Sequence, residues 1–100
     1  MGIWSFASRQ SSQDLVTGAL TMTVANGEPI QVCGIVFDNN TGSAIRIAIN
    51  DASGNKVSSC NVPACETFEV RTHWLADKGL QIVSECTGVY CTVFHNSPGN

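Results

Sequence analysis

The sequence carries few charges, and those it has are spread thinly. Charged residues make up 13% of the 100 positions, with five basic and eight acidic side chains and a formal net charge of −3. Soluble domains average about 25% charged residues, so this surface is unusually neutral. Proteins bind nucleic acid largely by neutralising phosphates, which requires clustered basic side chains. The sequence predicts no nucleic-acid partner, because its basic residues are scattered at Arg9, Arg46, Lys56, Arg71 and Lys78.

Long apolar runs and catalytic motifs are also missing. No stretch approaches the ~20 apolar residues that a membrane-spanning helix needs. Residues 1–9 lack the basic leader and apolar centre of a signal peptide, which predicts synthesis in a host cytoplasm and no membrane partner. There is no nucleophile-elbow motif, phosphate-binding loop or paired-carboxylate motif, and no spacing pairs His73 or His95 with a cysteine. We therefore expect no enzymatic activity, no cofactor, and surface or capping roles for both histidines.

Alternation of apolar and polar residues at period two is abundant. Ile45, Ile47 and Ile49 alternate with small or polar residues, and the turn-forming residues 51–55 follow them. Such alternation places the isoleucines on one face of a strand. The pattern recurs, and predicts an all-β domain: a compact sandwich or jelly-roll-like barrel of about seven antiparallel strands. The expected strands cover residues 15–25, 30–38, 44–50, 56–60, 66–71, 80–85 and 89–95, and Gly18 is a candidate break in the first of them.

The chain divides into an arm at residues 1–14, a β-sandwich domain at residues 15–96 and a short tail at residues 97–100. The arm combines three apolar side chains, Ile3, Trp4 and Phe6, with a polar linker at residues 9–14. Large aromatic side chains are typical anchors of protein interfaces. Docking on a neighbouring subunit of a homo-oligomer, with a trimer as one candidate, and docking back on the same sandwich both remain open. Residues 74–76 are expected to form one helical turn that caps the sandwich.

Four of the five cysteines form two pairs of identical spacing. Cys60 and Cys65 flank the link between the fourth and fifth expected strands. Cys86 begins the link between the sixth and seventh, and Cys91 lies early in the seventh. In an up-and-down arrangement both links fall at one end of the domain, which would bring four thiols together. Greek-key crossing would separate them instead.

Three interpretations of these cysteines stay open. A zinc site needs tetrahedral thiolate ligands, and the present spacing is wider than the usual C-x-x-C knuckle. Disulfides are opposed by a reducing cytoplasm but become accessible in an oxidising medium after assembly. The third interpretation is that they are small buried hydrophobic residues, a common role for free cysteine. Cys33, on the expected central strand, is predicted to be of this last kind.

Several strand–turn–strand segments resemble small β-sandwich virion proteins of tailed bacteriophages, of the capsid decoration or cement type. They are residues 35–44, 62–68, 79–84 and 88–94, so the resemblance covers roughly residues 30–95. It contains no diagnostic motif, and therefore no functional residue is carried over.

The resemblance implies a non-enzymatic structural protein located on the virion. It implies binding to the outer capsid surface and bridging of neighbouring subunits, with the major capsid protein or other virion proteins as partners. A tail, baseplate or fibre-adaptor protein is the first alternative. The second is a host-surface or carbohydrate-binding module, in which Trp74 and Tyr90 would form a sugar platform.

Overall fold

The computed structural model describes residues 9–16, 20–25 and 27–96 of the chain. The expected arm anchors Ile3, Trp4 and Phe6 and the tail at 97–100 lie outside these residues. The described part is all-β, and no helix in it is long and apolar enough to cross a membrane. Its eight strands are β1 (Arg9–Leu15), β2 (Thr21–Val24), β3 (Ile30–Asn39), β4 (Ile45–Asp51), β5 (Lys56–Val62), β6 (Thr67–Ala76), β7 (Leu80–Ser84) and β8 (Val89–Asn96).

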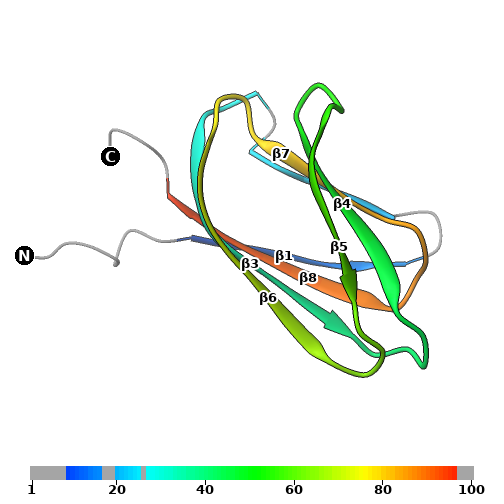
Figure 1. Ribbon diagram of the computed structural model, residues 1–100. Coiled ribbons are helices and arrows are strands. Elements are labelled where there is room, and N and C mark those ends of the chain that lie inside the picture. The colour runs from blue at the N-terminus through cyan, green and yellow to red at the C-terminus, as the bar shows by residue number, and fades with distance from the viewer. Residues whose placement is uncertain (1–8, 17–19, 26, 97–100) are drawn as a thin grey trace, which may run out of the picture.

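The strands form two four-stranded antiparallel sheets that pack face to face (Figure 1). One sheet has the order β1-β8-β3-β6 and the other has the order β2-β7-β4-β5. Strands that are neighbours in the sequence lie in different sheets, except for the β4–β5 hairpin, and the first strand pairs with the last. This is the order of an eight-stranded jelly roll. The predicted all-β sandwich is confirmed, with eight strands where about seven were expected.

The additional strand lies in the segment that was interpreted as a polar linker, and that interpretation is wrong. Residues 9–15 form β1 and pair with β8 along their whole length, from Arg9 opposite His95 to Leu15 opposite Val89. The side chains of this edge strand make polar contacts that composition does not reveal. The Ser12 hydroxyl, for example, lies 3.0 Å from the Thr92 hydroxyl on β8.

Two further expectations about the elements need correction. The expected first strand at residues 15–25, which allowed for a break at Gly18, is two strands: β1 ends at Leu15 and β2 begins at Thr21, and Gly18 itself lies outside the described residues. The expected helical turn at residues 74–76 is instead the end of β6, where Trp74 pairs with Val32 and Ala76 with Ile30. Pairing with the long central strand β3 thus extends β6 beyond the alternation visible in the sequence.

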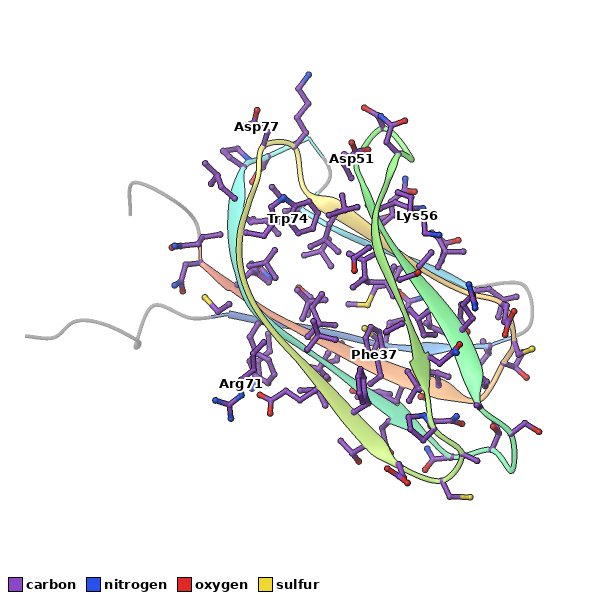
Figure 2. All side chains as sticks on the ribbon, in the orientation of Figure 1. Phe37, Asp51, Lys56, Arg71, Trp74 and Asp77 are labelled. Atoms are coloured by element: carbon purple, nitrogen blue, oxygen red, sulfur yellow. The ribbon has the colours of Figure 1, made fainter. Side chains whose placement is uncertain are left out.

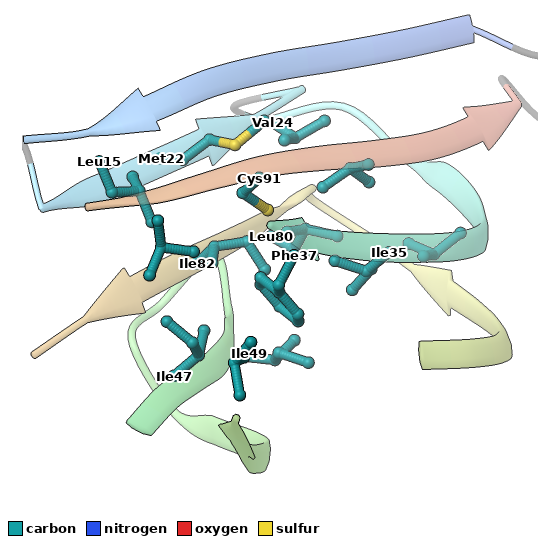
Figure 3. Close-up of a cluster of buried hydrophobic side chains, with 14 of the residues drawn as sticks. Leu15, Met22, Val24, Ile35, Phe37, Ile47, Ile49, Leu80, Ile82 and Cys91 are labelled. Atoms are coloured by element: carbon teal, nitrogen blue, oxygen red, sulfur yellow. The ribbon is translucent and has the colours of Figure 1, made fainter. Parts of the chain in front are cut away.

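The core lies between the two sheets and follows the period-two pattern (Figure 3). Ile45, Ile47 and Ile49 of β4 are buried, as are Ile35 and Phe37 of the facing strand β3. Burying a side chain of this size contributes about 1.5–3 kcal/mol. Apolar burial therefore fixes the register of the two sheets, because a slip of one residue would turn these side chains outward.

Asn39 fastens one end of the sandwich through a buried hydrogen-bond network. Its side chain is 1% exposed, and its amide nitrogen donates to the backbone carbonyls of Ser43, Val62 and Pro63 at 2.9, 3.1 and 3.1 Å. Its amide oxygen accepts hydrogen bonds from the backbone N–H and the hydroxyl of Thr41, at 2.9 and 2.7 Å. Both ends of the amide are satisfied, as burial of a polar group requires.

Backbone hydrogen bonds join the neighbouring turns to the same end. The Cys65 N–H donates to the Thr41 carbonyl at 3.0 Å, and the Asn40 N–H donates to the Gly88 carbonyl at 3.1 Å. Gly88 has a positive φ of 101°, and a Cβ there would overlap the Thr41 side chain, so the turn requires glycine. We call these joined segments the loop cluster: residues 39–43, 62–65 and 85–88.

Candidate functional site: an apolar groove between two edge strands

The sandwich is open along the side where β5 and β6 face each other. β5 is the edge strand of one sheet and β6 is the edge strand of the other, so each has a ladder partner on one side only. An edge strand presents unpaired backbone N–H and C=O groups that can pair with another extended segment. The side chains between these two strands therefore decide what can approach.

Two adjoining pockets form a groove between the strands. The larger has a volume of about 340 Å³ and lies where the β4–β5 and β6–β7 turns meet. The smaller, of about 90 Å³, reaches toward the core. Val57 and Trp74 line both, so the two pockets lie side by side. Apolar residues dominate the inner part of the groove, which is lined by Ile35, Ile49, Val57, Ser58, Val70 and Trp74.

Trp74 forms the wall of the groove that is contributed by β6. It pairs with the buried Val32 of β3, so its side chain points into the sandwich, where it is half-buried against the core. Figure 2 shows Trp74 between β6 and β5, below the turns that carry Asp51 and Asp77. Its neighbour Leu75 is 60% exposed and also lines the larger pocket.

Val57 forms the opposite wall because of an irregularity in β5. Ser58 pairs with Ile49 and Lys56 pairs with Asn50, which leaves Val57 as the additional residue of a β-bulge. Its side chain is 49% exposed at the mouth of the groove. The bulge thus displays an apolar side chain on an edge strand, where polar residues normally protect against pairing.

The charged groups at the rim are few and of both signs. Asp51, Asp77 and Lys78 line the larger pocket. The Asp51 carboxylate is already engaged in its turn, where one oxygen accepts from the backbone N–H groups of Ser53 and Asn55 at 2.9 Å each. The groove therefore suits an extended apolar segment with little net charge, which could also pair with a free strand edge.

The groove residues Val57 and Leu75 were not singled out in the sequence. Leu75 belonged to the expected helical turn, and Val57 belonged to a short expected strand. The available signal was an apolar residue between exposed polar neighbours, as in Lys56-Val57-Ser58. Without the pairing of β5, that signal does not show that the residue lies on an open edge.

The structure separates the four paired cysteines into two groups. The loops that carry Cys65 and Cys86 lie at the same end, joined through Thr41 and Gly88 of the loop cluster, and both residues are exposed. Cys60 and Cys91 lie farther along their strands and pack in or against the core. All five cysteines are unpaired in the structure, and no three His, Cys, Asp or Glu of the described residues are placed to hold a metal ion.

Burial determines the acidity of the interior thiols. Burial raises the pKa of the Cys91 thiol from its ordinary value of 9.0 to about 12, and the nearby Cys60 adds to the increase. Burial also raises the pKa of the Cys60 thiol. Both remain protonated at neutral pH and are poor nucleophiles.

Cys33 is half-buried instead of a core residue, because it falls where the register of β3 shifts between Val32 and Gly34. Its thiol approaches the Gln31 carbonyl at 3.7 Å, and the Asn96 amide nitrogen lies 3.5 Å from its sulfur.

Two other expected roles differ in the structure. His95 is 6% exposed, which makes a surface role wrong, and its Nε2 lies 3.0 Å from the Ser11 hydroxyl. The side chain of His73 lies outside what the structure describes. Trp74 and Tyr90 form no common platform. Trp74 points inward opposite Val32, whereas Tyr90 is exposed near the start of β8.

Among solved structures, this chain is similar to chains of virus particles. No protein-family model matches the chain, and no curated protein matches it. A chain of infectious bursal disease virus, Gx strain, is 13% identical over 93% of this chain and 32% of that chain, with a TM-score of 0.34. A chain of another infectious bursal disease virus particle is 16% identical over 94% and 32%, with a TM-score of 0.27. This chain therefore spans about a third of the length of each.

Proposed function

We propose that the protein is a structural component of a virion, and specifically a capsid decoration protein of the tailed-bacteriophage type. It binds the outer capsid surface, bridges neighbouring subunits and has no enzymatic activity. The observation that carries this proposal is the jelly-roll strand order, β1-β8-β3-β6 against β2-β7-β4-β5. Viral capsid domains commonly use this fold, and so do lectins, so the argument from fold is one of analogy.

The surface chemistry supports a role in docking. On β2 and β4, the residues that alternate with the core are mostly small and uncharged, with Arg46 as the exposed cation. A neutral face loses little hydration energy when a partner covers it, because desolvation is most expensive for charged groups. The groove adds exposed apolar side chains at Val57 and Leu75.

Such a protein would bind the capsid firmly through many weak contacts made together. The described domain is small, so one copy offers a limited contact area. On a repetitive lattice, contacts to the major capsid protein and to other copies are made together, and their combined strength exceeds that of each contact alone. The proposed location is therefore the assembled virion.

A tail, baseplate or fibre-adaptor protein would use the same sandwich at another position. A carbohydrate-binding or host-surface module is supported by a separate observation: the larger pocket combines the Trp74 side chain with Ser53 and Asp77. Its volume of about 340 Å³ is within the ~300–1,000 Å³ range of small-ligand sites. An aromatic wall beside hydroxyl and carboxylate groups is suitable for a sugar.

The decisive experiment measures binding of the purified protein to purified capsids, to tails and to a glycan array. We expect saturable co-sedimentation with capsids, at one copy or more per lattice repeat, and greater resistance of the capsids to heat. Binding to tails alone would place the protein in the first alternative. Glycan binding that Trp74→Ala abolishes, without capsid binding, would contradict the proposal.

A further inference from the structure

We propose that the β5–β6 groove receives residues 1–8 of a second copy of this chain, bound as an extended segment. The inference deepens the proposed function, because it names the contact through which copies would bridge. It also concerns the free protein in solution. Self-association in solution and binding to capsids are therefore separate measurements, and either one can fail while the other succeeds.

The groove has the features of an uncovered interface. Val57 and Leu75 are both largely exposed at its mouth, and Trp74 and Val70 continue the apolar surface inward. β5 and β6 each keep one unpaired edge beside it. An extended segment can bury the apolar side chains and pair its backbone with one edge at the same time, as in strand addition.

The composition of residues 1–8 complements this surface. The segment contains no charged side chain, and it carries Ile3, Trp4 and Phe6 within four positions. In an extended backbone, Trp4 and Phe6 point to one side and Ile3 to the other. Two aromatic side chains would then enter the groove together.

Strand register defines where this segment leaves the sandwich. Arg9 is opposite His95, His95 is opposite Val32, and Val32 is opposite Trp74, so these four residues form one row across the sheet. Arg9 lies at one end of that row and Trp74 at the other. Three strand spacings of ~4.8 Å separate them by about 14 Å.

This distance favours a second copy over the same chain. An extended chain spans at most ~3.6 Å per residue, so the backbone at Phe6, three residues before Arg9, reaches only about 11 Å. Crossing about 14 Å in this way uses about four residues, so Ile3 and Trp4 of the same chain could reach its groove but Phe6 could not lie along it. A neighbouring copy can place its Trp4 and Phe6 along the groove together. The contact is heterologous, since the segment of one copy meets the groove of the next.

Complementation between two full-length variants tests this arrangement by analytical ultracentrifugation. One variant lacks the anchors (Trp4→Ala with Phe6→Ala), and the other has a blocked groove (Val57→Asp with Leu75→Asp). We expect the wild-type chain to self-associate. Each variant alone should associate at least about thirtyfold more weakly, which is the effect of losing about 2 kcal/mol at an interface hot spot. An equimolar mixture should form a heterodimer, because it contains one intact segment and one intact groove.

The matched control is Val16→Asp, since Val16 is 49% exposed like Val57 but lies beyond β1, outside the groove. It should self-associate as the wild type does. A monomeric wild-type chain, or a mixture in which no heterodimer forms, would overturn the proposal. So would an anchor variant that keeps its association but melts at a much lower temperature, because the segment would then dock on its own chain.

Discussion

The loop cluster and the β5–β6 groove differ in what they leave exposed. The first satisfies its buried polar groups, whereas the second leaves apolar side chains in solvent. In the loop cluster, the buried Asn39 amide has every partner it needs, and neighbouring backbone groups close the turns. In the groove, Val57 and Leu75 are left in contact with solvent beside two unpaired strand edges. The first arrangement stabilises the monomer, whereas the second leaves binding energy available for a partner. We therefore expect substitutions in the loop cluster to change stability and substitutions in the groove to change association.

The largest expected effect on stability comes from Asn39→Ala. The substitution leaves buried carbonyls and a turn N–H without partners, and each unsatisfied group costs about 1–3 kcal/mol. We expect a total loss of about 3 kcal/mol, which lowers the melting temperature of a domain of this size by about 12–24 °C. Thermal unfolding followed by circular dichroism measures it. Asn40→Ala, an exposed neighbour, is the control and should change stability by less than about 0.5 kcal/mol.

Two glycines with the same φ sharpen the comparison at the groove end. Gly79 and Gly54 both have a φ of 89°, but a Cβ at Gly79 would overlap the backbone carbonyls of Val24 and Ala25, whereas Gly54 faces open space. We expect Gly54→Ala to cost about 1 kcal/mol from backbone strain alone. Gly79→Ala should cost at least about 2 kcal/mol, because packing must also shift. Equal losses in urea unfolding would show that the β6–β7 turn is not tightly held.

An alkaline titration tests the burial of Cys91. The unfolded thiol ionises near 9.0 and the folded thiol near 12, so its contribution to stability is complete below about pH 9 and declines as pH rises toward 12. Between pH 9 and 11 the wild type should lose about 1–2 kcal/mol more than Cys91→Val, which cannot ionise. Parallel urea unfolding of both proteins measures the difference. Identical curves for wild type and Cys91→Val would contradict the assigned burial.

The smallest expected effect on stability is in the groove. Val57→Asp and Leu75→Asp replace largely exposed side chains, so each should change the stability of the monomer by less than about 0.5 kcal/mol. Urea unfolding at a concentration too low for association measures this. A loss above about 2 kcal/mol would show that these residues support the fold, and the contrast between the two ends would fail.

Much of the fold could be predicted from the sequence, because apolar alternation directly reports which strand face is buried. The isoleucines of β4 and the long apolar run of β3 are examples. β1 could not be recognised, since an edge strand of serine, glutamine and aspartate lacks that alternation. The extension of β6 through Trp74 depends on pairing with β3, a partner about 40 residues away along the chain, which no local signal records.

The candidate site was less accessible to prediction than the fold. The groove is formed by residues of β3, β4, β5 and β6, and the jelly-roll order alone brings β5 and β6 to facing edges. The loops that carry Cys65 and Cys86 lie at one end although the strand order is not the up-and-down order on which that expectation depended, and burial is decided along each strand. Cys60 and Cys91 therefore face the core, while Cys65 and Cys86 face solvent. The arm anchors Ile3, Trp4 and Phe6 remain a prediction.

Photo-cross-linking between isotopically distinct copies tests most directly whether the groove is an assembly site. A photoreactive amino acid replaces Phe6 in a chain labelled with ¹⁵N, which is mixed with unlabelled wild-type chain, irradiated and digested for mass spectrometry. We predict cross-links from position 6 of the heavy chain to peptides of the light chain that contain Val57 or Trp74. Cross-links confined to one isotopic form at every mixing ratio, or directed to peptides outside the groove, would contradict the account.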